Sequence, residues 1–202
     1  MINDIRSLKG LMLLAALLTL GACATKVERI SPDQVRDLSG NWNDTDSQLV
    51  SKEMISDVLS QAWLSNFQRA HSKQPAVIVG EIRNLSHEHI NMNTFVGDME
   101  RALINSGKVE FVASKQERQE IREERKDQDI NASEATRKAM GQEIGADFML
   151  KGTINTILDT EGKEQVRYYQ VDLNLISLAD NRIVWLGQKK IKKFITKASF
   201  RP

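Results

Sequence analysis

The sequence contains one cysteine, three prolines and three histidines in 202 residues. A single cysteine excludes an internal disulfide bond. The net charge is only +1, so the chain lacks the basic excess that is typical of nucleic-acid-binding proteins. Hydrophobic residues nevertheless make up 41% of the chain, which is typical of a soluble globular domain with a real core. The length suits one domain with short appendages.

Motifs of catalysis and cofactor binding are also absent. No G-x-S-x-G, P-loop or G-x-G-x-x-G sequence occurs. His87 and His89 form an H-x-H pair, but no further ligand pattern accompanies them, which favours a solvated loop over a metal site. The adjacent carboxylates Glu123 and Glu124 lie in a highly charged segment, which favours a solvated helix face over an acid of raised pKa. We therefore predict that the chain is not an enzyme and holds no cofactor or metal.

The main apolar run covers residues 10–20 and is too short to span a membrane as a helix. Two basic residues precede it, and two small residues follow it directly before Cys23. This order is typical of an export signal with its processing site. We therefore predict a signal peptide over residues 1–22.

Polar residues and turn signals dominate residues 23–46, which predicts a tether. Trp42 is the apolar exception, and we expect it to dock on the domain that follows. Residues 47–202 contain the periodic segments and are predicted to form that single domain.

Within residues 47–202, the periodicity predicts helices and strands in the order α-β-α-β-α-α-β-β-β. The predicted elements are a helix over residues 47–71, a strand over residues 75–82, a helix ending at Gly107, a strand over residues 108–114, a helix opened by a capping box of Ser114 and Glu117, a helix from Asn131 to about Gly145, and three strands separated by turns at residues 159–163 and 179–181. Helical crossovers favour parallel pairing of the early strands, whereas the final hairpins must be antiparallel. We therefore predict an α/β (α+β) fold: one domain with a mixed sheet of about five strands, packed with about four helices.

The helix that begins near Ser114 has its charges on two sides. A rotation of about 100° per residue places Arg118, Arg122 and Arg125 on one side and most of the acidic residues on the other. A partner of complementary charge would offset this segregation, while a plain solvated helix is the alternative interpretation. The candidate partner-binding residues are these three arginines, together with Asn84, His87 and His89 from a predicted polar loop.

The C-terminal stretch over residues 189–201 is also basic. Contact with anionic lipid or with a glycan polymer is one interpretation. Protection of an edge strand by lysines is the other, and it explains most of the pattern.

The sequence Leu20-Gly21-Ala22-Cys23 resembles the lipobox of bacterial lipoproteins. This resemblance implies cleavage before Cys23 and attachment of lipid to its sulfur and its new amine. Two or more acyl chains on one residue give durable anchoring. Ala24 follows the cysteine, and in lipoproteins this position implies the outer membrane, here with the domain facing the periplasm.

Three further stretches resemble the LpoB family, whose members are outer-membrane lipoproteins that activate class A penicillin-binding proteins. They cover residues 75–114 with Arg83-Asn84 and Asn105-Ser106-Gly107-Lys108, residues 141–154 with Gly145-Ala146-Asp147, and residues 169–193 with Ile183-Val184-Trp185. The resemblance implies a fold like the N-terminal domain of TolB and a noncatalytic role. The domain would dock on a regulatory domain of a peptidoglycan synthase and favour its active state.

Well-known members of that family carry a long, proline-rich tether, whereas the tether predicted here is short and contains one proline, Pro32. The short tether keeps a second function open. In that alternative the chain is a structural lipoprotein of an outer-membrane secretion or assembly complex, where TolB-like folds also occur.

Overall fold

The computed structural model describes residues 26–136 and 143–197. The chain divides into two compact units, Met1–Gln34 and Val35–Pro202. The described part of the first unit, residues 26–34, contains no helix or strand, and its backbone turns where Gln34 N donates to the Ser31 carbonyl at 3.0 Å. Every described helix and strand belongs to the second unit.

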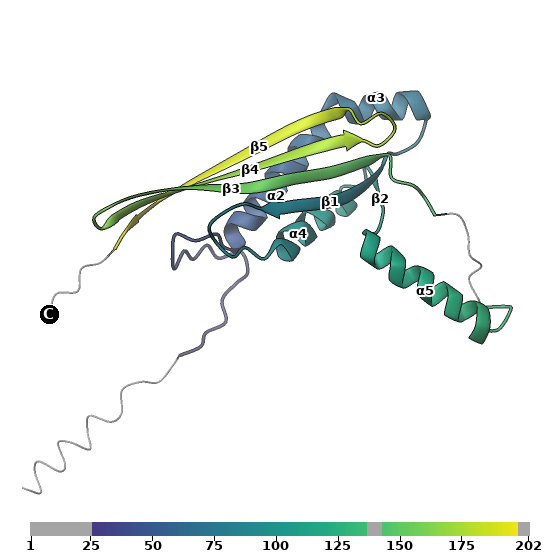
Figure 1. Cartoon of the computed structure of the whole chain (residues 1–202), viewed down its shortest axis with the longest axis horizontal. Helices are drawn as coiled ribbons and strands as arrows, with labels where there is room; N and C mark the ends of the chain where they lie inside the picture. The colour runs from purple at the N-terminus through teal and green to yellow at the C-terminus, as the bar shows by residue number, and fades with distance from the viewer. Residues whose placement is uncertain (1–25, 137–142, 198–202) are drawn as a thin grey trace, which may run out of the picture. The chain divides into compact units, whose positions relative to one another are not determined.

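Five strands form one sheet in the order β2-β1-β3-β4-β5 (Figure 1). The strands are β1 (Ala76–Asn84), β2 (Glu110–Phe111), β3 (Phe148–Glu161), β4 (Glu164–Ser177) and β5 (Ile183–Thr196). β1 pairs in parallel with both β2 and β3, whereas β3, β4 and β5 pair antiparallel. The predicted mixed sheet is confirmed, although the strand predicted over residues 108–114 is reduced to the two residues of β2.

The turn between β3 and β4 is shorter than the predicted turn over residues 159–163. The two strands stay paired up to Glu161 and Glu164, so only Gly162 and Lys163 connect them. Gly162 has a φ of 56°, a conformation that glycine adopts without strain in such two-residue turns. The second predicted turn lies between β4 and β5, as expected.

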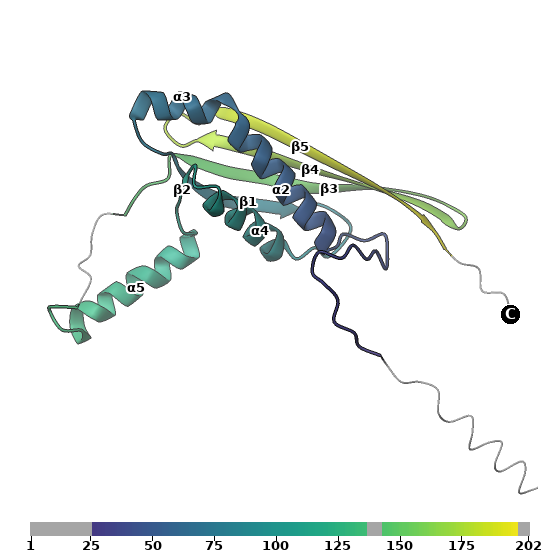
Figure 2. The same ribbon diagram turned by 180° about the vertical axis from the view of Figure 1, so that it is seen from behind.

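The described helices are α2 (Asp44–Ser60), α3 (Ala62–His71), α4 (Met92–Asn105) and α5 (Lys115–Asn131), in agreement with the predicted number. Helices α2 and α4 pack together and lie on one face of the sheet, while α5 stands apart from them (Figures 1 and 2). The side chains of β4 that alternate toward these helices are fully buried: Tyr169, Val171, Leu173 and Leu175. The described helices leave the other face of the sheet uncovered.

The single helix predicted over residues 47–71 is in fact two helices. The first begins earlier, at Asp44, where a capping box satisfies its N-terminus. Gln61 then adopts an extended conformation and separates α2 from α3. The indole nitrogen of Trp63 donates to the Val58 carbonyl at 2.6 Å, which satisfies a carbonyl at the end of α2. Apolar spacing continues across this break, so periodicity alone could not reveal it.

The helix predicted from Asn131 to about Gly145 falls partly on residues 137–142, outside the described residues. Residues 133–136 form a turn, and residues 143–146 have no regular structure. Asn131 ends α5 instead of opening a new helix: Ala132 after it is extended, and the Asn131 amide donates back into the helix, to Asp127 Oδ1, at 2.8 Å. The predicted capping box of Ser114 and Glu117 at the start of α5 is confirmed.

The core depends on a close approach between α2 and the sheet. A Cβ atom at Gly187 would overlap the Trp185 indole and lie 2.9 Å from the methyl group of Met54 on α2. Gly152, two strands away in the same register, has no space for a Cβ beside the backbone of β4. The Trp185 indole nitrogen also donates to Asp57 Oδ2 at 2.8 Å, which ties β5 to α2.

Gly187→Ala should lower the free energy of unfolding by roughly 1–3 kcal/mol, because the added methyl group must displace the Trp185 indole. Gly97→Ala in α4 is the matched control: no atom lies within 4 Å of a Cβ there, and alanine is the better helix former. Its stability should stay constant or rise by about 1 kcal/mol. Urea unfolding measures both variants, and an equal loss in the two would contradict the packing argument.

Candidate functional site

The three C-terminal strands project beyond the helices at the end that carries the β3–β4 turn (Figures 1 and 2). Each strand has 14 residues and α2 has 17 residues. At their usual rises the strands span about 46 Å and the helix only about 26 Å. We call the projecting part, residues 155–170 and 190–196, the arm.

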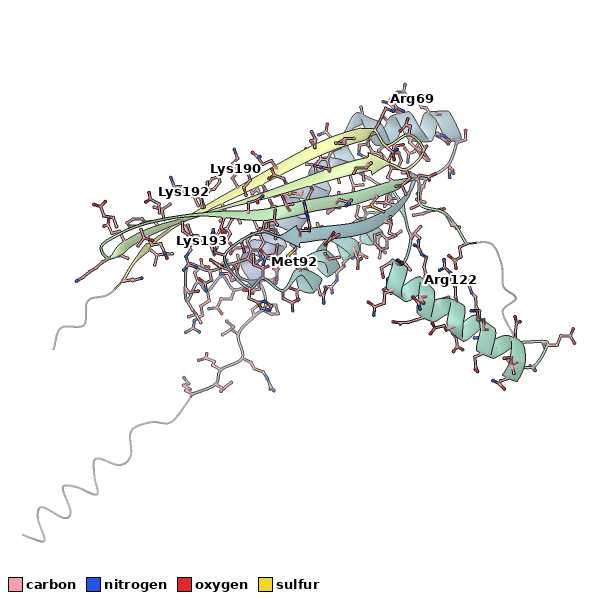
Figure 3. The ribbon with its side chains drawn as sticks, viewed as in Figure 1. Arg69, Met92, Arg122, Lys190, Lys192 and Lys193 are labelled. Atoms are coloured by element: carbon pink, nitrogen blue, oxygen red, sulfur yellow. The ribbon has the colours of Figure 1, made fainter. Side chains whose placement is uncertain are left out.

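The uncovered face of the arm carries exposed apolar side chains. Cross-strand pairing places Ile157, Tyr168 and Lys192 side by side. Ile157 and Phe194 are each 64% exposed, and Lys190 lies on the same face of β5, as Figure 3 shows. We call these five residues the arm patch. Grouped apolar side chains that remain exposed are typical of a protein-binding surface.

The arm patch was missed by the sequence analysis, which explained the basic C-terminal stretch as protection of an edge strand. A usable signal was present in two pairs of adjacent apolar residues, Ile157-Leu158 and Phe194-Ile195. Because neighbouring side chains in a strand point to opposite faces, one member of each pair must point away from the core.

On its other face, the arm is covered by residues 37–42, which we call the strap. Glu88 is the central contact: its Oε2 accepts a hydrogen bond from the Trp42 backbone nitrogen at 2.9 Å. Its Oε1 lies 2.6 Å from Nη1 of Arg167 and 2.7 Å from the Tyr169 hydroxyl. The side chains of Glu88 and Arg167 are only 13% and 19% exposed, so this ion pair depends on the surrounding hydrogen bonds.

The protonation states of Glu88 and Tyr169 follow from their contacts with each other, with Trp42 and with Arg167. Burial is the largest influence on Glu88 and acts to raise its pKa, but the hydrogen bonds from Trp42 and Tyr169 and the charge of Arg167 outweigh it. The pKa of Glu88 therefore lies below its ordinary value of 4.5. Burial and the neighbouring carboxylate raise the pKa of Tyr169 far above its usual range. At pH 7, Glu88 is thus an ionised acceptor and Tyr169 a neutral donor.

Lys193 makes a second set of contacts between the strap and the arm. Its Nζ lies 2.6 Å from Asp46 Oδ2, 3.1 Å from the Asn41 carbonyl and 3.5 Å from Asp37 Oδ1. Asp46 also belongs to the capping box of α2. One carboxylate therefore links the start of α2 to β5, beside the strap.

Trp42 docks on the domain, as the sequence predicted. Its ring makes edge contacts with Phe95 and Tyr169, with centroids 5.9 and 5.5 Å apart, and its indole nitrogen donates to the Ser47 hydroxyl at 2.7 Å. The tether was predicted to run to residue 46, yet the compact unit begins at Val35. The second half of that predicted segment therefore packs against the domain.

The predicted residues Asn84, His87 and His89 lie together at the loop of residues 85–91, next to the arm. Asn84 Nδ2 donates to the Glu88 carbonyl at 2.7 Å, so this side chain stabilises the loop. The backbone nitrogen and ring Nδ1 of His87 lie 3.2 and 3.1 Å from the Thr156 hydroxyl on β3. His87 and His89 are both exposed. Because Thr156 pairs with the buried Tyr169, this loop lies against the strap-covered face of the arm and not on the face of the arm patch.

Arg118, Arg122 and Arg125 lie on α5, at the other end of the sheet from the arm (Figures 1 and 3). Arg122 makes two hydrogen bonds of 2.7 Å to the Glu143 carboxylate, and Arg125 lies 3.9 Å from it. Nε of Arg118 is buried without a hydrogen-bond partner. The structure therefore does not bring the predicted loop and the predicted helix into one site.

A groove of ≈ 890 Å³ lies between α3 and the β4–β5 turn, at the end of β4 and β5 away from the arm. Its floor is aromatic: Trp63, Phe67, Phe148 and Trp185. In the described ranges, no His, Cys, Asp and Glu side chains are grouped as metal ligands would be. Among those same residues, no helix has the length and apolar character needed to span a membrane. Cys23, the predicted lipidation site, lies outside the described residues.

Glu88→Gln should lower the free energy of unfolding at pH 7 by about 2 kcal/mol, because Arg167 loses a charged hydrogen-bond acceptor. The pKa of Glu88 is depressed on folding, so its contribution is complete above 4.5 and is lost as the pH falls through the lower folded value. The difference between wild type and variant should shrink accordingly when urea unfolding is repeated in acid. Glu81→Gln, on the exposed side of β1, is the control. It should leave the free energy of unfolding unchanged both at pH 7 and in acid. A difference that persisted unchanged in acid would contradict the role of the charged carboxylate.

Several solved structures are similar to this chain, among them the following three. The LpoB C-terminal domain from Escherichia coli is 15% identical with a TM-score of 0.43, and the match covers 73% of this chain and 99% of that chain. Lipoprotein GNA1162 from Neisseria meningitidis is 12% identical with a TM-score of 0.37, covering 59% and 83%. The PelC dodecamer from Paraburkholderia phytofirmans is 12% identical with a TM-score of 0.35, covering 60% and 74%. No curated protein matches the sequence.

One family model matches the sequence itself over residues 46–191, and it is described as peptidoglycan-synthase activator LpoB. The match begins in the first turn of α2 and ends in β5, so it includes β1 to β4 in full and β5 as far as Ile191. It also contains the stretches on which the sequence resemblance rested, except the last two residues of the third. The chain therefore belongs to the LpoB family of peptidoglycan-synthase activators.

Proposed function

We propose that this chain is an outer-membrane lipoprotein that binds a class A penicillin-binding protein and activates it in peptidoglycan synthesis. Membership of the LpoB family supports the role of activator. The lipobox-like sequence that ends at Cys23 supports the lipid anchor, with the domain in the periplasm. The role is noncatalytic, because an activator of this kind acts by binding one state of its partner more tightly than the other.

The observation that carries the proposal on the structural side is the arm patch. Activation requires a contact surface, and an exposed Ile157 and Phe194 beside Tyr168 supply apolar area that water covers in the free protein. Lys190 and Lys192 border this area and would select a partner surface that carries acidic groups. We propose that the arm patch contacts the regulatory domain of the synthase, and that His87 and His89, exposed on the loop beside the other face of the arm, make a further contact with it.

The arginines of α5 are a second proposed contact, separate from the arm. Arg122 and Arg125 already share Glu143, and exposed ion pairs of this kind contribute little to stability. Their charge remains available to an acidic partner. The distance between α5 and the arm means that one compact partner domain is expected to use mainly one of the two surfaces (Figure 1).

A second function is favoured by the short tether. Residues 23–34, ahead of the compact unit that begins at Val35, reach at most roughly 40 Å when fully extended. A structural lipoprotein of an outer-membrane secretion or assembly complex would need no longer reach. The two functions differ in whether the isolated chain changes the activity of a synthase.

The first test adds the purified, unlipidated chain to the class A penicillin-binding proteins of the same cell and follows glycan polymerisation and crosslinking. Ile157→Ser with Phe194→Ser should weaken binding of the responding synthase at least tenfold, because two apolar anchors are lost. Ile104→Ser on α4 is the matched control, since Ile104 is 54% exposed but lies outside both proposed surfaces, and it should bind like the wild type.

Reversal of Arg118, Arg122 and Arg125 to glutamate tests the second surface in the same assay. We expect a smaller loss of binding than in the arm variant. If the charge-reversed variant no longer bound the synthase while the arm variant bound it normally, the interface would lie on α5. Stimulation of none of the synthases by the wild-type chain would instead favour the assembly-complex function.

Cys23→Ala should abolish acylation, because the thiol that accepts the lipid is lost. The variant is expected to remain unprocessed or to be released from the outer membrane. Metabolic labelling with a fatty acid, followed by membrane fractionation without detergent, measures both effects. Recovery of labelled variant in the outer-membrane fraction would contradict the proposed anchor.

A further inference from the structure

The strap lies within the segment predicted as a tether, directly before α2, and it contains no helix or strand. Residues 35–39 and Asn41 are exposed, whereas Gly40 is buried. A Cβ atom at Gly40 would overlap the side chain of Ile195 on β5, so the backbone itself packs against the arm. The strap is therefore seated closely while burying few side chains.

Polar contacts hold the strap in place. Besides the contact of the Trp42 backbone with Glu88, the Gly40 carbonyl lies 3.0 Å from the Tyr169 hydroxyl, and the Asn41 carbonyl accepts from Lys193 at 3.1 Å. Water can replace each of these contacts. Opening would expose a small apolar area, which is the contact of Trp42 with Phe95 and Tyr169 and the Ile195 side chain beside Gly40. Segments that bury so little apolar area open at far lower free energy than a packed core.

The strap also has a defined end. The capping box at the start of α2 closes that helix just after Trp42, so opening of the strap need not disturb α2. In the other direction, residues 26–34 contain no helix or strand and transmit any pull directly to the strap. Tension would break the contacts of the strap one after another, beginning at residue 37.

We infer that the strap is a release latch for the tether. Tension between the lipid anchor and a bound partner opens residues 37–42 while the sheet and α2 stay folded. Opening adds at most roughly 20 Å to the reach of the tether, which is the extended length of six residues. The inference rests on the proposed function for the existence of that tension, but the latch itself is a property of the isolated chain.

Hydrogen exchange measured by mass spectrometry tests the latch on the full chain carrying Cys23→Ser in detergent. Backbone amides of residues 40–43 should exchange at least tenfold faster than those of Leu173 and its neighbours in β4, and their rates should hardly depend on low urea concentrations. Lys193→Met should accelerate the strap amides about tenfold further and leave β4 unchanged. Lys190→Met, on the other face of the same strand, is the matched control and should change neither.

Exchange of the strap and of β4 at the same rate, with the same dependence on urea, would overturn the latch, because the strap would then open only when the domain unfolds. A pulling experiment gives an independent readout. Handles attached through Ser31→Cys and Lys163→Cys, in the Cys23→Ser background that has no other cysteine, should report a low-force extension of roughly 20 Å before the domain unfolds. A single cooperative unfolding step would likewise overturn the latch. Neither readout involves a synthase, so failure of the proposed function would leave both results unchanged.

Discussion

The three C-terminal strands are longer than the helix that covers them, and the rest of the structure depends on how this mismatch is resolved. Strands of 14 residues outreach α2 by about 20 Å. Without cover, the inner face of the arm would expose apolar side chains to water. The chain instead places two cations there, Arg167 and Lys193, and neutralises them with Glu88 and Asp46. The strap then satisfies the hydrogen bonds that these buried charges still require.

The other end of the sheet shows the opposite solution. There α2 and α3 cover the strands, and the contact is apolar: the indoles of Trp63 and Trp185 are each 7% exposed. Close approach of the helix requires Gly187, since any larger residue would displace the Trp185 ring. One end of the sheet is therefore held by packing and the other by charge. Acid protonates the carboxylates that hold the arm but leaves apolar packing unchanged, so we expect a falling pH to destabilise the arm before the core.

Much of the fold was predictable because it depends on local patterns. The turn signal at residues 179–181 located the connection between β4 and β5 correctly, and Ser114 with Glu117 identified the start of α5. The features that the sequence did not predict also have physical causes. Gln61 breaks a helix whose apolar spacing continues, and the Trp63 indole satisfies the Val58 carbonyl that the break leaves free. The candidate site was less predictable still, because Glu88, Arg167 and Trp42 are distant in sequence and meet only after the sheet has formed.

The lysines of β5 show why a charge pattern alone does not define a surface. The basic stretch was explained as protection of an edge strand, and β5 is indeed the edge of the sheet. Alternation divides it into two sets, however. Lys189 and Lys193 point to the helical side and pair with Glu53 and Asp46. No described acidic side chain pairs with Lys190, which belongs to the arm patch on the open face. Protection of an edge would be served equally by lysines on either face, whereas binding a partner requires unpaired lysines next to exposed apolar area. The same strand therefore stabilises the arm through one face and leaves the other free for recognition.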